Sequence, residues 1–122
     1  MRYDFLVDTY ASERLKVLGT WSSFQDRDLE ARPRAGDARG RSVLGQMVHQ
    51  CVSENAWFRG MLGLDVNAPP LPGEETRLGF LQRYAQDSGA RLAGLSRTDE
   101  PWWEASVPFF DVTRTRAWVL VR

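Results

Sequence analysis

The chain has a single histidine, His49, and this residue is its first candidate for chemistry. It stands in the stretch SVLGQMVHQCVSENAWFRGMLG, residues 42–63. An imidazole can bind a metal ion, transfer a proton or pack in a core, and a lone histidine at the edge of a helical face is most often a core or surface residue. Position alone therefore favours a structural role for His49.

The neighbours of His49 do not complete a metal site. Cys51 is two residues further on, and two helical steps turn a side chain by about 200° around the axis, so the two cannot share an ion. The nearest acid, Glu54, is expected to face elsewhere, and the chain has no second imidazole. The residues by themselves predict no complete set of metal ligands.

Nucleophilic catalysis is not indicated either. Cys51 falls in the middle of a helix on its apolar stripe, which predicts a buried and unreactive thiol. Ser42 is expected to cap the helix and Ser53 to lie on the surface, so no Ser-His-Asp arrangement is predicted.

Two aromatic pairs form the other candidate site. They lie in RTDEPWWEASVPFFD, residues 97–111. The two prolines of this segment predict irregular structure there, neither helix nor strand. Aromatic residues this dense either cover the core or line a pocket. The pocket hypothesis selects three of them: Trp102, Trp103 and Phe110.

Three long amphipathic helices are expected to carry these residues. The first runs from Asp4 to about Phe24, the second from Ser42 to Gly63, and the third begins near Thr76. The expected core face of the first helix is Val7, Tyr10, Ala11, Leu15, Leu18 and Trp21. The expected core face of the third is Leu78, Leu81, Tyr84, Ala85, Ser88, Leu92 and Leu95, with Arg77, Gln82, Arg83, Asp87 and Arg91 outside it.

The connections and the end of the chain complete the predicted organisation. Residues 25–41 read as a long surface connection, and Asp65 to Glu75, rich in proline, as a loop. The segment TRTRAWVLVR, residues 113–122, predicts a short helix capped by Asp111 or Thr113, with a strand as the alternative. Its apolar run stops at Arg122 without a helix-ending signal, so a truncated last helix is expected.

Composition limits the class of protein. The 122 residues include 16 basic and 16 acidic side chains, which gives no electrostatic case for nucleic acid. One cysteine and the lack of a signal peptide or a long apolar run predict a soluble cytoplasmic protein without a membrane partner. Residues 1–122 are predicted to form one all-α domain.

The stretch GRSVLGQMVHQCVSENAWFRGMLG, residues 40–63, and the stretch FFDVTRTRAWVLVR, residues 109–122, resemble the bacterial DinB/YfiT family. The resemblance implies an up-down four-helix bundle with a long connection between helices 1 and 2. It also implies that His49 is one of three histidines that bind nickel or zinc. The other two would come from a His-x-x-x-His run beyond Arg122.

The resemblance further implies a stress-associated, metal-dependent enzyme, similar to a thiol-dependent S-transferase or a hydrolase. Its partners would be a small-molecule substrate, with a low-molecular-weight thiol, and a second copy of the chain in a homodimer. The alternative from the residues is a metal-free helical bundle that serves binding or dimerisation.

Overall fold

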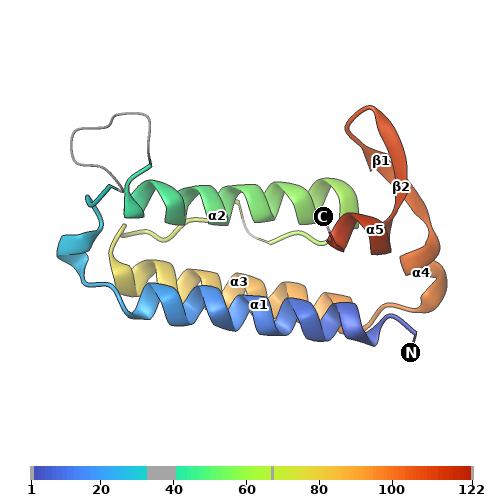
Figure 1. Cartoon of the computed structure of the whole chain (residues 1–122), viewed down its shortest axis with the longest axis horizontal. Helices are drawn as coiled ribbons and strands as arrows, with labels where there is room; N and C mark the ends of the chain where they lie inside the picture. Colours follow the sequence, from blue (N-terminus) through green and yellow to red (C-terminus); the bar gives the residue numbers. More distant parts are fainter. Residues whose placement is uncertain (1, 33–40, 67, 122) are drawn as a thin grey trace.

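The computed structural model describes residues 2–32, 41–66 and 68–121, and it is mostly helical. Its long helices are α1 (Asp4–Ser22), α2 (Val43–Trp57) and α3 (Arg77–Ser96). Helices α1 and α3 pack side by side, and α2 runs along them (Figure 1). A π-helical turn, η2 (Phe58–Leu62), extends α2, and a 3-10 turn, η1 (Asp26–Asp28), follows α1.

Capping residues begin both α2, where the sequence predicts the cap, and α3, where it predicts only a helix start near Thr76. Ser42 Oγ accepts a hydrogen bond from the Gly45 N–H at 3.0 Å, and Thr76 Oγ1 accepts one from the Gly79 N–H at 3.0 Å. Gly63, with a φ of 68°, ends the extension of α2 in the left-handed region that glycine tolerates. The described residues of the loop predicted from Asp65 to Glu75 contain neither helix nor strand.

The chain after α3 departs from the predicted irregular segment. It forms a short helix α4 (Glu100–Glu104) and the strands β1 (Ser106–Phe109) and β2 (Val112–Thr115), followed by α5 (Arg116–Val121). The two strands pair antiparallel from Ser106↔Thr115 to Phe109↔Val112. The all-α expectation is thus corrected to a mostly helical fold with one small sheet, which lies at one end of the long helices (Figure 1).

The hydrophobic core consists of two clusters of buried side chains. The first lies next to α5: Leu6, Tyr10, Phe58, Leu62, Leu95, Trp103, Val107 and Val119. The second lies toward the other end of the long helices: Trp21, Leu29, Met47, Cys51, Phe80 and Tyr84. The burial of Cys51 confirms the sequence prediction.

The prediction that Leu15 and Leu78 belong to the core is wrong. Leu15 and Leu78 are 61% and 56% exposed. The physical reason is that Leu6 and Phe80 define the buried faces of α1 and α3. Leu15 is nine residues from Leu6 and Leu78 two residues from Phe80, so each lies about half a turn away from the buried face.

The predicted surface connection, residues 25–41, is described in part, since residues 33–40 lie outside the described residues. At the C-terminus, the helix begins at Arg116 and not at a cap by Asp111 or Thr113, because residues 112–115 pair as a strand. Across the described ranges, no helix combines the length and the apolar content needed to cross a membrane.

Candidate functional site

The structure contains a cavity of about 680 Å³ between α1, α2 and α5. Residues four apart on α1 and on α2 line it, because side chains at i and i+4 share one helix face. The lining consists of Phe5, Leu6, Thr9, Tyr10, Glu13, His49, Gln50, Ser53, Glu54, Trp57, Phe58, Leu120 and Val121. The cavity is large enough for a small organic molecule.

The cavity has one apolar and one polar end. Helices α1 and α2 run in opposite directions (Figure 1), so Phe5 of α1 is at the same end as Trp57 of α2, next to Leu120 of α5. At the other end, Glu13 of α1 is level with His49 of α2. This order would orient a ligand that has an apolar part and a polar part.

The Glu54 carboxylate forms the centre of a polar cluster on the cavity wall. The phenols of Tyr10 and Tyr84 each donate a hydrogen bond to it at 2.9 Å, and Gln50 Nε2 donates one at 3.1 Å. The Arg91 guanidinium forms an ion pair with the same carboxylate. Four donors fill the four lone-pair positions of a carboxylate, so Glu54 is fixed in place.

Helix α3 supplies charged residues to this cluster that the sequence prediction placed outside the core. Arg91 and Asp87 are only 2% and 5% exposed. Arg91 lies over the Phe58 ring at 5.5 Å from its centroid, and Asp87 pairs with Arg83 at 2.8 Å. The prediction was wrong because apolar periodicity treats every charge as exposed, although paired charges can be buried.

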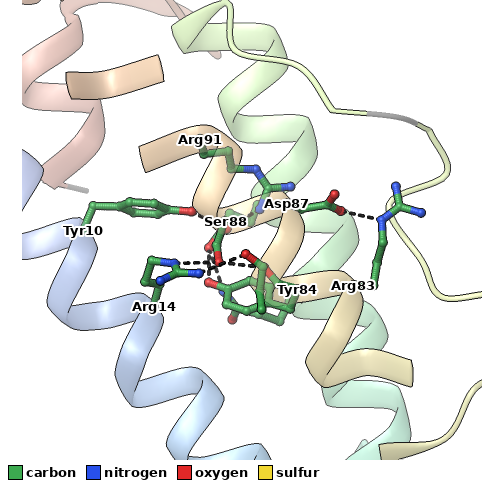
Figure 2. Close-up of polar contacts among 10 residues, drawn as sticks. Tyr10, Arg14, Arg83, Tyr84, Asp87, Ser88 and Arg91 are labelled. Atoms are coloured by element: carbon green, nitrogen blue, oxygen red, sulfur yellow. Dashed lines mark hydrogen bonds and ion pairs between the residues drawn. The ribbon is translucent and has the colours of Figure 1, made fainter. Parts of the chain in front are cut away.

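A further contact ties α1 to α3 beside the cluster. Arg14 of α1 donates from Nε to Ser88 Oγ and from Nη2 to the Ala85 carbonyl, both at 2.9 Å. Figure 2 shows Tyr10 and Arg14 reaching from α1 toward α3, where Ser88, Tyr84 and Arg91 lie. These contacts hold the α1 wall of the cavity against the core.

The two phenols of the cluster and the nearby Cys51 thiol keep their protons at neutral pH. Burial, and then the negative charge of Glu54, raises the pKa of Tyr10 and of Tyr84 above the ordinary range of a phenol. Burial likewise raises the pKa of Cys51 to about 12. The two phenols are therefore permanent donors, and Cys51 is an unreactive thiol.

His49 lies on the cavity lining, and its side chain is exposed. Ser53 Oγ is 3.2 Å from its Nδ1, a contact that the four-residue spacing could have indicated and that the sequence prediction missed. Glu54 lines the same cavity, but its oxygens are occupied by other donors. No carboxylate of the described residues hydrogen-bonds the imidazole, so a Ser-His-Asp triad is not formed.

The described residues do not form a metal site around His49. No group of three His, Cys, Asp or Glu side chains that could hold an ion occurs within residues 2–32, 41–66 and 68–121. A structural or catalytic zinc site needs at least three protein ligands, and here His49 would supply one. The described residues by themselves therefore do not supply the ligands that a metal-dependent step needs.

The aromatic residues predicted to line a pocket lie outside the lining of this cavity. Trp103 is fully buried and stacks on Tyr3, with 5.9 Å between ring centroids. The guanidinium carbon of Arg116 lies over the Trp102 ring, 4.7 Å from the ring centroid. Phe110 is 78% exposed at the turn between β1 and β2. The cavity takes its aromatic lining from α1, α2 and η2 instead.

Comparisons with protein-family models, with curated proteins and with solved structures found no match to this chain. Membership of the DinB/YfiT family therefore stays a prediction from the sequence.

Proposed function

We propose that this chain is a helical domain that binds a small molecule in the cavity between α1, α2 and α5. The observation that carries the proposal is the cavity itself, about 680 Å³ in volume, with aromatic and aliphatic side chains at one end and polar side chains at the other. Ligand sites in proteins have this size and this combination of an apolar lining with a few polar groups.

The residues around the cavity would contribute to binding in different ways. Phe5, Leu6 and Trp57 offer apolar surface, so a ligand gains about 25 cal/mol for each Å² of apolar surface that it buries there. Glu54 and its four donors keep the wall rigid, which lowers the entropic cost of binding. The polar end supplies the hydrogen bonds that give specificity.

The proposal is tested by titrating the protein with 1-octanol in a calorimeter. We expect one molecule to bind per chain. Replacing Ser53 by Trp should weaken binding by about tenfold or more, since an indole on the cavity lining fills the space. The control is Ser12→Trp, on an exposed position of α1 outside the lining, which should bind as the natural chain does.

Two outcomes would contradict the proposal. One is the lack of binding by the natural chain, and the other is equal binding by Ser53→Trp and Ser12→Trp. In the second case the alcohol binds somewhere other than in the cavity. Circular dichroism of both variants would show that each keeps the helical content of the natural chain.

A second candidate function is the metal-dependent S-transferase or hydrolase activity that the DinB-like resemblance implies, within a four-helix bundle of which α1, α2 and α3 would be the first helices. The supporting observation is that His49 lines the same cavity. When Nδ1 donates to Ser53, the other ring nitrogen keeps a free lone pair, which is the form that binds a metal. Substrate and low-molecular-weight thiol would meet in this cavity.

The metal content of the purified protein tests this second candidate. If His49 is a ligand, bound nickel or zinc measured by mass spectrometry should fall to background in His49→Ala and persist in Ser53→Ala. Equal metal content in the natural chain and in His49→Ala would remove His49 from any metal site.

A further inference from the structure

We infer that the ligand of the α1–α2–α5 cavity is an amphipathic amine, with a protonated amino group at the Glu13 end and an apolar body at the Trp57 end. This inference rests on the proposed function, because it assigns the chemical class of the ligand to the same cavity.

The charged residues of the lining favour a cation. Two carboxylates, of Glu13 and Glu54, line the cavity, and no lysine or arginine of the residues that the structure describes does so. Arg91 neutralises Glu54 from behind the wall. Glu13 pairs with Lys16 at 3.0 Å, but both side chains are exposed, so this surface pair neutralises Glu13 less than the buried Arg91 neutralises Glu54. Glu13 can therefore still attract a cationic ligand.

The hydrogen-bonding capacity of the polar end also favours a donor. Glu13 uses Oε1 for Lys16 at 3.0 Å, and its side chain is 59% exposed, so its second oxygen can accept a bond. Thr9 already donates its hydroxyl proton to the Phe5 carbonyl at 2.7 Å, and Tyr10 donates to Glu54. The Thr9 and Tyr10 hydroxyls therefore offer lone pairs to a ligand, while the Ser53 and His49 pair keeps both a donor and an acceptor. An ammonium group, which has three donors and no acceptor, matches the acceptors of this end.

The opposite end fits an apolar body. Phe5, Leu6, Trp57, Leu120 and Val121 gather there, and none of them carries a charge. Phe5 and Glu13 are eight residues apart on α1, which corresponds to about 12 Å along the helix. An alkyl or aryl chain of medium length can therefore reach from the apolar end to the Glu13 carboxylate.

The test compares three probes with one body and different head groups, which are octylammonium, 1-octanol and octanoate. We expect octylammonium to bind the natural chain about tenfold or more tighter than octanoate, with 1-octanol between them. In Glu13→Gln the preference for octylammonium over octanoate should shrink to about threefold or less. The control Glu75→Gln removes the same charge from an exposed position outside the lining and should keep the full preference.

The outcomes separate the ligand class from the cavity function. If all three probes bind with similar affinity, or octanoate binds most tightly, the inferred amine is wrong while the proposed binding function stands. The same holds if Glu13→Gln and Glu75→Gln reduce the preference equally, because the effect is then one of net charge. If none of the three binds, the proposed function itself is overturned, and the inference with it.

Discussion

At the scale of single residues, the Glu54 to Arg91 ion pair is the most constrained feature of the site. The Arg91 side chain is 1% exposed and that of Glu54 12%. Replacing Glu54 by Gln leaves the Arg91 charge buried without a countercharge. We expect the free energy of unfolding, measured by urea denaturation, to fall by about 3 to 5 kcal/mol.

Two further variants complete this experiment. The exposed substitution Glu75→Gln should change stability by no more than about 0.5 kcal/mol. Adding Arg91→Met to Glu54→Gln should restore part of the loss, because the uncompensated charge is then gone. A loss below about 1 kcal/mol in Glu54→Gln would show that the pair is not buried as the structure has it.

The raised pKa values of Tyr10, Tyr84 and Cys51 make stability depend on alkaline pH. The unfolded chain releases these protons near pH 8.5 to 10, whereas the folded chain keeps them to higher pH. These three groups therefore do not lower the free energy of unfolding below about pH 8. Above that, it should fall by about 1.4 kcal/mol per pH unit for each group that is ionised only in the unfolded chain.

Urea denaturation at a series of pH values measures this decline. In Tyr84→Phe one ionisable phenol is missing. Above about pH 10 the free energy of unfolding of this variant should therefore fall less steeply, by about 1.4 kcal/mol per pH unit. Two results would contradict the assignment of this pH dependence to the buried phenols and thiol. One is a natural chain that keeps its stability up to pH 11, and the other is a decline in Tyr84→Phe as steep as that of the natural chain.

Residue-level prediction from the sequence succeeded for isolated features and failed for the paired ones. The sequence singled out His49, which lies on the cavity, and placed Cys51 in the core. It missed Glu54 and Arg91, because their burial depends on partners from helices far apart in the sequence. Spacing along one helix gives no information on such partners.

At the scale of elements, two glycines of α3 make a matched pair. A Cβ added at Gly89 would meet nothing nearer than Arg14 Nη2 at 3.6 Å, so Gly89→Ala should stabilise the protein by about 1 kcal/mol. A Cβ added at Gly79 would lie 2.3 Å from the Glu74 carbonyl oxygen. Gly79→Ala should therefore destabilise by about 1 to 3 kcal/mol, despite its gain in helix propensity.

Thermal unfolding of the two variants checks this pair. Opposite shifts of the melting temperature are expected, upward for Gly89→Ala and downward for Gly79→Ala. Shifts of the same sign would mean that the loop before α3 does not approach the helix as closely as the structure shows.

The long helices could be predicted from sequence and the β-hairpin could not. Ser42 and Thr76 cap α2 and α3, and these capping signals are local. The strands have only four residues each, and Phe110 takes a φ of 55° at their turn, where glycine or asparagine is the usual signal. Nothing in the hydrophobic pattern of residues 106–115 marks that turn.

At the scale of the whole molecule, the polar cluster joins two separate parts of the core. Tyr10 belongs to the hydrophobic cluster next to α5 and Tyr84 to the other cluster, and both donate to Glu54. The cavity opens beside this junction. The proposed ligand site therefore lies where α1, α2 and α3 are held together by directional contacts.

The oligomeric state is a prediction at the same scale. The resemblance to the DinB/YfiT family implies a homodimer of two 13.9 kDa chains. Sedimentation equilibrium over a wide range of protein concentration should then give twice the mass of one chain at the upper end. The mass of a single chain at every concentration would contradict the dimer.

We propose that the cavity between α1, α2 and α5 binds a small molecule. Titration of isotope-labelled protein with 1-octanol, followed by nuclear magnetic resonance, tests it most directly. The proposal predicts backbone shift changes concentrated in residues 5–13 and 49–58, with contacts from the octyl chain to the Trp57 indole. Shift changes confined to residues 77–86 or 106–115, or no shift changes at all, would contradict the claim.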